Sequence, residues 1–482
     1  MAPSLKPIVL ICSTPVSGHI IPMIAIAKQL IARGYEVCFV SGSGYRDQVE
    51  AVGASFVAVQ GYGDFYDLTS WDLDLDWPAG KPHLEGPACF NHDLIHIFCK
   101  SLPSQYDAIQ RALKLLTATN NDNQRQRPII LMTESLNFGA LPLTLGAPGL
   151  RPTAFIAIGL NPILLTSMDH PPFGSGMLPD STREGRERNK AANIIQKTQT
   201  FAEAQAGFVE ALAAVGVPPS RKADLFLLDS LYALPDRFVQ MCAPSVEYPR
   251  SDAPKTLRFA GGYPPAASQT TNNWQKPEWW DRVISSKRKI IFVCQGTVAM
   301  DFSQLVIPTL AALKDTDKEI ALIVALGRPG MALPASPLIP YPLPKNYYVV
   351  DYIPYDALLP HVDVFITTGG YGSFQRALLH ATPLIVAGTT EEKPESAARA
   401  EWAGVAVNLR TSYPSPEQIR GAVDEVLANR RYKDRAVEIQ AEIRGFDPVG
   451  VVVENIEELA AAAAAAADAA AGGGGNSVVR EE

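Results

Sequence analysis

The sequence lacks closely spaced cysteines, long apolar runs and a surplus of basic residues. Its six cysteines, at positions 12, 38, 89, 99, 242 and 294, form no CxxC pair. We therefore expect reduced thiols in a cytoplasmic protein, without a disulfide framework or a cysteine-based zinc site. No window reaches the roughly 20 apolar residues of a membrane-spanning helix, so we expect neither an integral membrane segment nor a secretory leader.

Charge and length narrow the class further. The chain carries 42 Lys and Arg against 50 Asp and Glu, a formal charge of −8. This balance argues against a nucleic-acid partner, because such binding depends on cationic side chains. With 47% hydrophobic and 19% charged residues, the composition is that of a soluble globular protein. A chain of 482 residues is too long for one ordinary core and predicts two domains of about 200 residues each.

Two series of strand and helix patterns follow one another along the chain. Residues 7–12 (PIVLIC) and 36–41 are apolar enough for buried strands, and residues 20–33 between them repeat apolar side chains on one helix face. A second series starts with residues 289–294 (KIIFVC). Because alternating strands and helices form parallel sheets, we predict an α/β protein with two Rossmann-like domains.

The stretch at residues 362–409 carries the strongest pattern. A short apolar run there ends in a turn with three glycines, which are Gly369, Gly370 and Gly372. Ser373 then opens a helical stretch, and bare backbone before a helix N-terminus suits a phosphate group. A second strand at 383–387 leads to an acidic turn and another helix, so both turns lie on one edge of a parallel sheet. Strand, glycine turn and helix also occur in many α/β proteins that bind no nucleotide.

The whole stretch resembles the donor-binding signature of family 1 glycosyltransferases, most closely the fungal and macrolide-type enzymes. The matching segments read TTGGYGSFQRAL and PLIVAGTTEEKPESAAR, and EYPR followed by RFAGGYP extends the resemblance to about residues 7–445. It implies the GT-B fold, in which two Rossmann-like domains face each other across a cleft, with the acceptor in the first and the donor in the second. Such enzymes move a sugar from a nucleotide diphosphate to a small acceptor.

Domain boundaries follow from composition and from this resemblance. We predict an acceptor-binding domain at residues 1–245, a linker rich in Pro, Gly, Ser, Thr and Asn at 246–277, and a nucleotide-sugar-binding domain at 278–445. A C-terminal helix at 446–460 is expected to pack back on the first domain. The Ala- and Gly-rich residues 461–482 form a low-complexity tail.

His19 is the first catalytic candidate. It follows the first predicted strand, in the segment GHIIP, which resembles the G-H-x-x-P segment that carries the general base of the family. A neutral imidazole can take a proton from an alcohol near neutral pH, provided that a partner fixes its tautomer. The residue could instead cap the helix or bond a backbone carbonyl.

Glu134 is the expected partner of His19. It lies in the loop after the predicted strand at 128–132, where family members usually have Asp. The alternative is a solvated loop carboxylate. The resemblance implies one displacement with inversion, in which Glu134 supports His19 while the donor loops stabilise the departing diphosphate.

The donor site departs from the family pattern at three positions. Thr368 replaces a diphosphate-binding His, Arg376 replaces a Glu that holds the ribose hydroxyls, and Lys393 replaces a Gln. A cation cannot accept hydrogen bonds from ribose, so Arg376 could attract phosphate or indicate another nucleotide. Tyr352 offers a smaller stacking surface for the base than the usual Trp. The full predicted donor set is Gly296, Thr297, Tyr352, Ile353, Thr368, Gly370, Gly372, Ser373, Arg376, Glu392 and Lys393.

Loops rich in Gly, Pro and aromatic residues, at 64–85 and 169–179, are expected to build an apolar acceptor pocket. We therefore expect an apolar acceptor, a secondary metabolite. Each aromatic residue, taken singly, is more often part of a core. The predicted lining of the pocket is Phe90, Phe98, Phe138, Met168 and Phe173.

We predict no cofactor and no metal, a nucleotide diphosphate sugar as co-substrate, UDP-glucose by default, and a monomeric chain. Two motifs leave a metal open. His92 and His96 are one helical turn apart, a spacing that could hold zinc, although an ordinary amphipathic helix is the favoured interpretation. Asp72, Asp74 and Asp76 form D-x-D-x-D, similar to a metal motif of the other main glycosyltransferase architecture, although a solvated acidic turn is favoured.

Two other functions stay open. A catalytically silent binding or helper protein with this fold would explain Thr368 and Arg376, whereas an intact His19 argues against it. A nicotinamide-dependent oxidoreductase is suggested only by glycine loops such as that of Gly42 and Gly44, which lack the third glycine of G-x-G-x-x-G.

Overall fold

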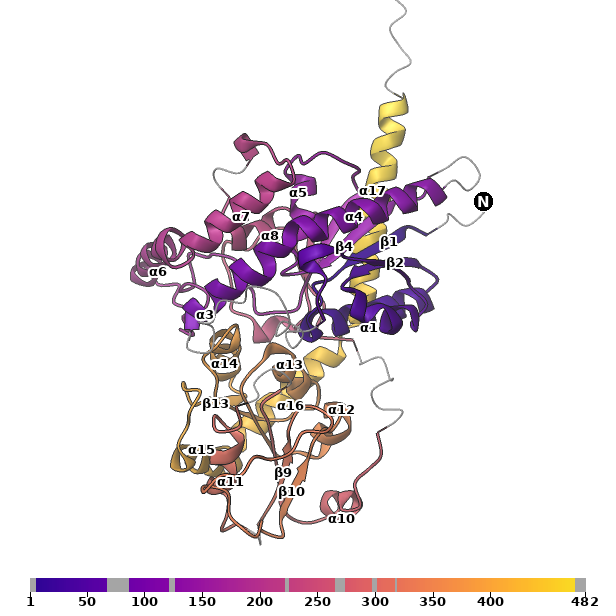
Figure 1. The fold of residues 1–482 in the computed structure, drawn as a ribbon. Coiled ribbons are helices and arrows are strands. Elements are labelled where there is room, and N and C mark those ends of the chain that lie inside the picture. The colour runs from indigo at the N-terminus through magenta and orange to yellow at the C-terminus, as the bar shows by residue number, and fades with distance from the viewer. Residues whose placement is uncertain are drawn as a thin grey trace, which may run out of the picture.

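The structure, a computed structural model, describes residues 6–66, 86–120, 126–221, 225–264, 274–296, 301–316 and 319–472. These residues form two parallel sheets (Figure 1). The N-terminal sheet has seven strands in the order β3-β2-β1-β4-β5-β6-β7, and the C-terminal sheet has six in the order β10-β9-β8-β11-β12-β13. This arrangement confirms the predicted α/β class with two Rossmann-like sheets. We call the two parts the N-terminal half and the C-terminal half.

Most strands are continuous apolar runs, because a parallel sheet covered by helices on both faces buries nearly every residue. The N-terminal strands are β1 (Ile8–Cys12), β2 (Glu36–Ser41), β3 (Ser55–Ala58), β4 (Ile129–Glu134), β5 (Ala154–Gly159), β6 (Arg237–Gln240) and β7 (Leu257–Phe259). The C-terminal strands are β8 (Lys289–Cys294), β9 (Ile320–Ala325), β10 (Tyr347–Val350), β11 (Val364–Thr367), β12 (Leu384–Val386) and β13 (Ala406–Asn408).

Helices connect the strands. In the N-terminal half they are α1 (Ser17–Ala32), α2 (Arg46–Glu50), α3 (Gly86–Asp93), a π-helix (Leu94–Cys99), α4 (Lys100–Thr119), α5 (Leu141–Thr144), α6 (Arg183–Ile195), a second π-helix (Gln196–Thr200), α7 (Ala202–Ala214) and α8 (Leu227–Ala233). In the C-terminal half they are α10 (Trp280–Ile284), α11 (Val306–Ala312), α12 (Tyr355–Leu358), α13 (Tyr371–Leu379), α14 (Lys393–Trp402), α15 (Pro416–Ala428), α16 (Arg431–Arg444) and α17 (Pro448–Gly472). None of the described helices has both the length and the apolar character needed to span a membrane.

The strand order of each sheet reverses direction once, between β1 and β4 and between β8 and β11. In an open parallel sheet, the loops that follow such neighbouring strands diverge and leave a crevice for ligands. In the N-terminal half, His19 follows β1 and Leu136 follows β4. In the C-terminal half, Gly296 follows β8 and Gly369 follows β11. These loops are therefore the places where the fold favours binding.

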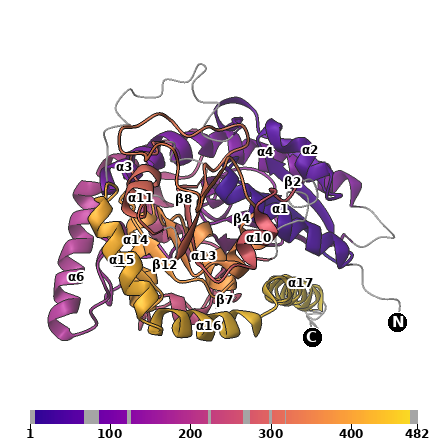
Figure 2. The same cartoon turned by 90° about the horizontal axis from the view of Figure 1, so that it is seen from below.

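Helix α17 connects the end of the C-terminal half to the N-terminal half. Figure 1 shows it running along the N-terminal half, and Figure 2 shows α16 leading into α17 on the side of α1. Val449, Val452 and Ile456 of α17 belong to the same apolar cluster as Val9 of β1 and Ile24 of α1. The end of the described chain thus packs against the first sheet and its covering helix.

Two segments differ from the expectations. β4 continues through Glu134, which pairs with Ile158 of β5, so this residue belongs to a strand rather than to a loop. β7 lies inside the predicted linker 246–277 and pairs with β6. The predicted C-terminal helix corresponds to α17, which continues to Gly472 because its alanine run favours a helix, and residues 473–482 lie outside the described chain. The domain boundaries stay a prediction.

A buried cation joins the two halves. Arg399 of α14 lies 2.7 Å from Glu247 Oε1 and 2.7 Å from Glu395 Oε2. The other carboxylate oxygen of Glu395 accepts hydrogen bonds from the backbone N–H groups of Gly174 and Gly176, at 2.9 and 3.0 Å. The three charged side chains are almost fully buried. We call this set of contacts the Arg399 clasp.

Arg399→Met is expected to lower the free energy of unfolding by about 3–5 kcal/mol, because it leaves two buried carboxylates without their cation. Urea or thermal unfolding measures the effect. Arg430→Met is the matched control, since Arg430 is 88% exposed and pairs with Asp434 at the surface. Equal loss of stability in the two variants would contradict the role of the clasp.

Candidate functional site

A cavity of about 490 Å³ opens between the carboxyl edges of the two sheets. The N-terminal half contributes the start of α1, residues of α3 and its π-helix, and the segment after β5, whereas the C-terminal half contributes the loops after β8, β11 and β12 and residues 352–356. The volume is in the range of small-molecule sites, roughly 300–1,000 Å³. Every predicted donor residue that the structure describes lines this cavity. Thr297 lies outside the described residues.

His19 and Glu134 form a hydrogen-bonded pair at the cavity wall. His19 Nδ1 lies 2.8 Å from Glu134 Oε2, although Glu is longer than the Asp usual in the family. The carboxylate also accepts hydrogen bonds from the backbone N–H groups of Thr14 at 3.2 Å and Leu136 at 2.7 Å. The pair forms because β1 and β4 are neighbours. Cys12 at the end of β1 is in register with Thr133, the residue before Glu134, and His19 lies in the first turn of the helix that follows β1.

This pair changes the acid–base properties of both residues. Burial alone would lower the pKa of His19, but the charge and hydrogen bond of Glu134 outweigh it and hold that pKa above its usual value. Burial would raise the pKa of Glu134, but His19 and the backbone N–H groups keep it below its usual value. An ionised Glu134 accepts the Nδ1 proton of a neutral His19, which leaves Nε2 as the ring nitrogen with a free lone pair.

Two stretches of bare backbone border the cavity in the C-terminal half. Gly370 is the N-cap of α13, and the first N–H groups of a helix have no acceptor within it. Tyr371 N donates to Glu392 Oε1 at 3.2 Å, and the next residue, Gly372, has no atom within 4 Å of the place where a Cβ would stand. Gly296 has φ +91° and equally open space. Such backbone allows the close approach of a diphosphate.

Thr368 lines the cavity, but its hydroxyl group forms a hydrogen bond within the protein. Thr368 Oγ1 donates to the carbonyl oxygen of Gln295 at 2.9 Å, which ties the loop after β11 to the loop after β8. A hydroxyl has one proton to donate, and in this structure the Thr368 proton goes to Gln295. In the structure Thr368 fixes the relative position of the two glycine-containing loops.

Lys393 is a partly buried cation at the cavity wall. Its Nζ donates to Thr390 Oγ1 at 2.9 Å and pairs with the carboxylate of Glu391. Burial would lower the pKa of Lys393, but the charges of Glu391 and Glu392 raise it, so the side chain stays protonated. The turn after β12 therefore presents a charged donor, Lys393, and two charged acceptors, Glu391 and Glu392, which are able to hydrogen-bond to hydroxyl groups.

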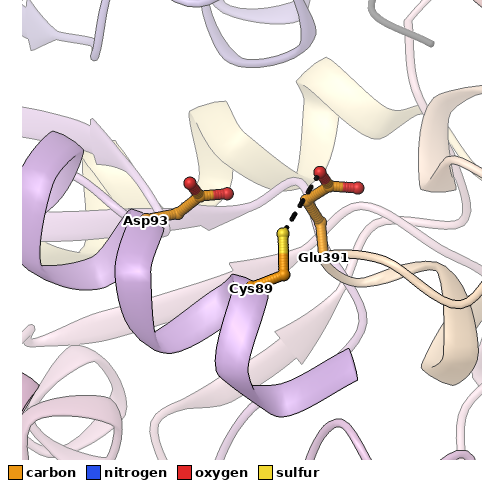
Figure 3. Close-up of side chains that lie close together, drawn as sticks. All are labelled: Cys89, Asp93 and Glu391. Atoms are coloured by element: carbon orange, nitrogen blue, oxygen red, sulfur yellow. Dashed lines mark hydrogen bonds between the residues drawn. The ribbon is translucent and has the colours of Figure 1, made fainter. Parts of the chain in front are cut away.

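Cys89, Asp93 and Glu391 come close together at the boundary of the two halves (Figure 3). Cys89 and Asp93 lie one turn apart on α3 and Glu391 faces them from the turn after β12, with possible ligand atoms within 4.8 Å of one another. Cys89 Sγ lies 3.8 Å from Glu391 Oε1. Since Glu391 already pairs with the Lys393 ammonium, a metal ion would compete with a fixed cation. The expectation of no metal stays a prediction.

His92 and His96 are not part of that group. The rings of His92 and His96 lie 4.4 Å apart between centroids on the helical segment after Gly86, and burial is the main cause that lowers the pKa of His96 to about 4. Asp72, Asp74 and Asp76 lie outside the described residues.

Three of the five residues predicted to line an acceptor pocket lie at this cavity. Phe90, Phe98 and Phe173 line the cavity, and the rings of Phe90 and Phe173 lie 5.3 Å apart. Phe138 does not: it is fully buried behind Phe98, because the segment after β4 turns its ring into the core. Met168 is 46% exposed and lies outside the cavity.

Asp356 is a cavity residue that the sequence-based set lacks. Its carboxylate accepts a hydrogen bond from His380 Nε2 at 3.0 Å and lies 3.4 Å from Arg376 Nη1. Asp356 and Arg376 line the cavity beside Tyr352. The sequence gives no signal for this contact, because no spacing rule connects residues 20 positions apart on two helices.

Known proteins are similar to this chain in sequence and in fold. The N-terminal domain of glycosyltransferase family 28 matches residues 16–122, and the C-terminal domain of erythromycin biosynthesis protein CIII-like matches residues 308–459. Over 461 residues the chain is 38% identical to UDP-glucosyltransferase A1 of Starmerella bombicola, with 95% of this chain and 94% of that protein covered.

Solved structures are similar over the full chain. The glycotransferase of kitacinnamycin has a TM-score of 0.66 at 19% identity, with 94% of this chain and 99% of that chain covered. Spinosyn rhamnosyltransferase SpnG, complexed with thymidine diphosphate, has a TM-score of 0.59 at 16% identity, with 93% and 99% covered. At 19% and 16% sequence identity, this structural similarity shows that the fold is shared.

Glu134→Gln is expected to lower the pKa of His19, because it removes the negative charge that opposes the effect of burial. The imidazole would then lose its proton at a lower pH than in the wild type. An NMR titration of the His19 ring protons measures the shift, and Glu50→Gln, at an exposed carboxylate, is the control. An unchanged His19 pKa in Glu134→Gln would show that the pair is not coupled.

Proposed function

This chain belongs to the UDP-glycosyltransferases with the predicted GT-B fold, and we propose that it transfers glucose from UDP-glucose to a hydroxyl group of a small apolar acceptor. The enzyme class and the small-molecule substrates follow from family membership. The transfer of glucose, the inversion of the anomeric configuration and the roles of individual residues are proposed. The name of the relative from Starmerella bombicola, a glucosyltransferase, supports glucose.

One observation carries the proposal: His19, hydrogen-bonded to the buried Glu134, lines the same cavity as two glycine-containing loops. The pair comes from the N-terminal half and the loops come from the C-terminal half. A base that faces a diphosphate cradle is what sugar transfer to an alcohol requires, since one proton must be removed and one anion must be stabilised.

The reaction is a single displacement at the anomeric carbon. Neutral His19 accepts the acceptor hydroxyl proton on Nε2 while the acceptor oxygen bonds to the anomeric carbon and the bond to the diphosphate breaks. The proton ends on His19, where Glu134 stabilises the imidazolium, and the electron pair leaves with the diphosphate. Because attack is opposite to the leaving group, the anomeric configuration inverts.

The departing diphosphate gains negative charge in this step. The N–H groups at the first turn of α13, together with the backbone of Gly296, can stabilise that charge without moving. Ser373 adds a hydroxyl group on the same turn. Glu392 and Lys393 line the cavity and would bind the hydroxyl groups of the sugar. Thr368 contributes by holding the two loops together.

Apolar side chains dominate the acceptor side of the cavity. Phe90, Phe98, Phe173 and Leu164 form much of that wall, with Asn161 as a polar neighbour. This composition favours an apolar secondary metabolite with a reactive hydroxyl group over a sugar or a peptide. The monomeric state, the absence of a cofactor and the cytoplasmic location stay predictions.

His19→Ala is expected to lower kcat by about 10²- to 10⁴-fold, the usual contribution of general base catalysis, and to leave UDP affinity unchanged. A coupled assay of UDP release and calorimetric titration with UDP measure the two effects. His361→Ala is the control, since His361 is exposed and outside the cavity. Full activity of His19→Ala would contradict the assignment, and a wild type that binds no UDP would favour a silent helper protein.

A further inference from the structure

We propose that Asp356 is the acceptor for the ribose 2′-hydroxyl of the donor nucleotide, and that it makes the site select ribonucleoside over 2′-deoxyribonucleoside diphosphates. This assignment rests on the proposed function, because it supposes that a nucleoside diphosphate sugar occupies the cavity. It goes beyond that function by naming a residue on α12 that the resemblance does not assign. Asp356, Arg376 and His380 are called the Asp356 cluster below.

Two neighbours hold the Asp356 carboxylate in place. His380 Nε2 donates to Oδ1 at 3.0 Å, and Arg376 Nη1 lies 3.4 Å from Oδ2 and 3.5 Å from Oδ1. Arg376 is itself fixed, since Nη2 donates to the carbonyl oxygen of Pro264 at 3.3 Å. The Asp356 side chain keeps 30% of its surface exposed and lines the cavity. The carboxylate is thus oriented by protein groups and still open to a ligand.

The charge of the cluster favours hydroxyl groups over phosphate. Burial would raise the pKa of Asp356, but the hydrogen bond from His380 and the charge of Arg376 lower it, so the carboxylate is ionised near neutral pH. An ionised carboxylate has about four acceptor positions and no proton to donate, and His380 with two long Arg376 contacts leaves room for another donor. The same carboxylate neutralises Arg376 and would repel a phosphate. The phosphate-binding role that Arg376 could have had is therefore disfavoured.

The position of the cluster matches the ribose. Arg376 follows Ser373 by three residues on α13, so both lie on one face of the helix, about 4.5 Å apart along its axis. Ser373 Oγ lies 3.5 Å from the hydroxyl of Tyr355, and Asp356 is the next residue. In a bound nucleotide, one carbon atom connects the diphosphate to the ribose. With the diphosphate at the first turn of α13, the ribose therefore lies beside this face of the helix, and the base lies toward Tyr352.

The cluster also accounts for the unusual residue at position 376. The resemblance implies an acidic side chain there, and a guanidinium cannot accept the hydrogen bonds that ribose donates. In the structure the acceptor comes from the neighbouring helix α12, and Arg376 holds that acceptor in place. The carboxylate that binds the ribose is thus on α12 instead of α13, and Arg376 is a positioning residue.

The test compares two ligands that differ in one hydroxyl group, UDP and 2′-deoxyuridine diphosphate. Calorimetric titration of the purified wild type is expected to give at least about 10-fold tighter binding of UDP, the effect of one hydrogen bond to a charged acceptor. Asp356→Asn is expected to weaken UDP by about the same factor and to leave 2′-deoxyuridine diphosphate unchanged. Asp434→Asn, at an exposed carboxylate, is the control and should keep the wild-type selectivity.

Each result decides the assignment. Equal wild-type affinities for the two ligands would overturn it, and this comparison needs no variant to fold. Equal weakening of both ligands by Asp356→Asn would also overturn it, because the residue would then act on the protein or on the diphosphate. In both cases UDP still binds and the proposed function survives. No binding of either ligand to the wild type would instead overturn the proposed function, and this assignment with it.

Discussion

The arrangement of the site depends on one buried cation, Arg399. Its guanidinium joins Glu395 of its own helix, α14, to Glu247, whose other oxygen accepts a hydrogen bond from the N–H of Ile163 in the N-terminal half. Glu395 in turn binds backbone N–H groups in the loop at residues 169–179. The clasp therefore connects α14 to two separate segments of the other half.

These connections reach both sides of the cavity. The loop at 169–179 carries Phe173 of the acceptor wall, and α14 begins at Lys393, directly after Glu392 of the donor side. Removing a guanidinium from water costs several kcal/mol, and the cost is offset only when its carboxylates and their hydrogen bonds are complete. The clasp thus favours one orientation of the two halves, in which His19 and the glycine-containing loops line one cavity.

Sequence patterns were sufficient for the two series of strands and helices. The strand–helix–strand pattern at residues 7–41 implies only that β1 and β2 are neighbours, whereas His19 meets Glu134 because β1 also pairs with β4. That partner was expected from the family resemblance and not from the pattern. Patterns could not separate Phe98, which faces the cavity, from Phe138, which faces the core, because both lie in apolar segments. Nor could they predict the contact of Arg399 with a carboxylate 152 residues away, since it depends on how the halves pack. Sequence patterns could not predict the contacts of the Asp356 cluster either, because these also depend on how separate helices pack.

Catalysis is assigned here to a base in one half and a diphosphate cradle in the other, acting in a single displacement. The most direct test is the anomeric configuration of the product formed from UDP-α-D-glucose, with a panel of apolar phenols and alcohols as acceptors. Proton NMR of the purified glucoside gives this configuration from the coupling of the anomeric proton. We expect a β-glucoside, whereas an α-glucoside would contradict direct displacement by an acceptor that His19 deprotonates.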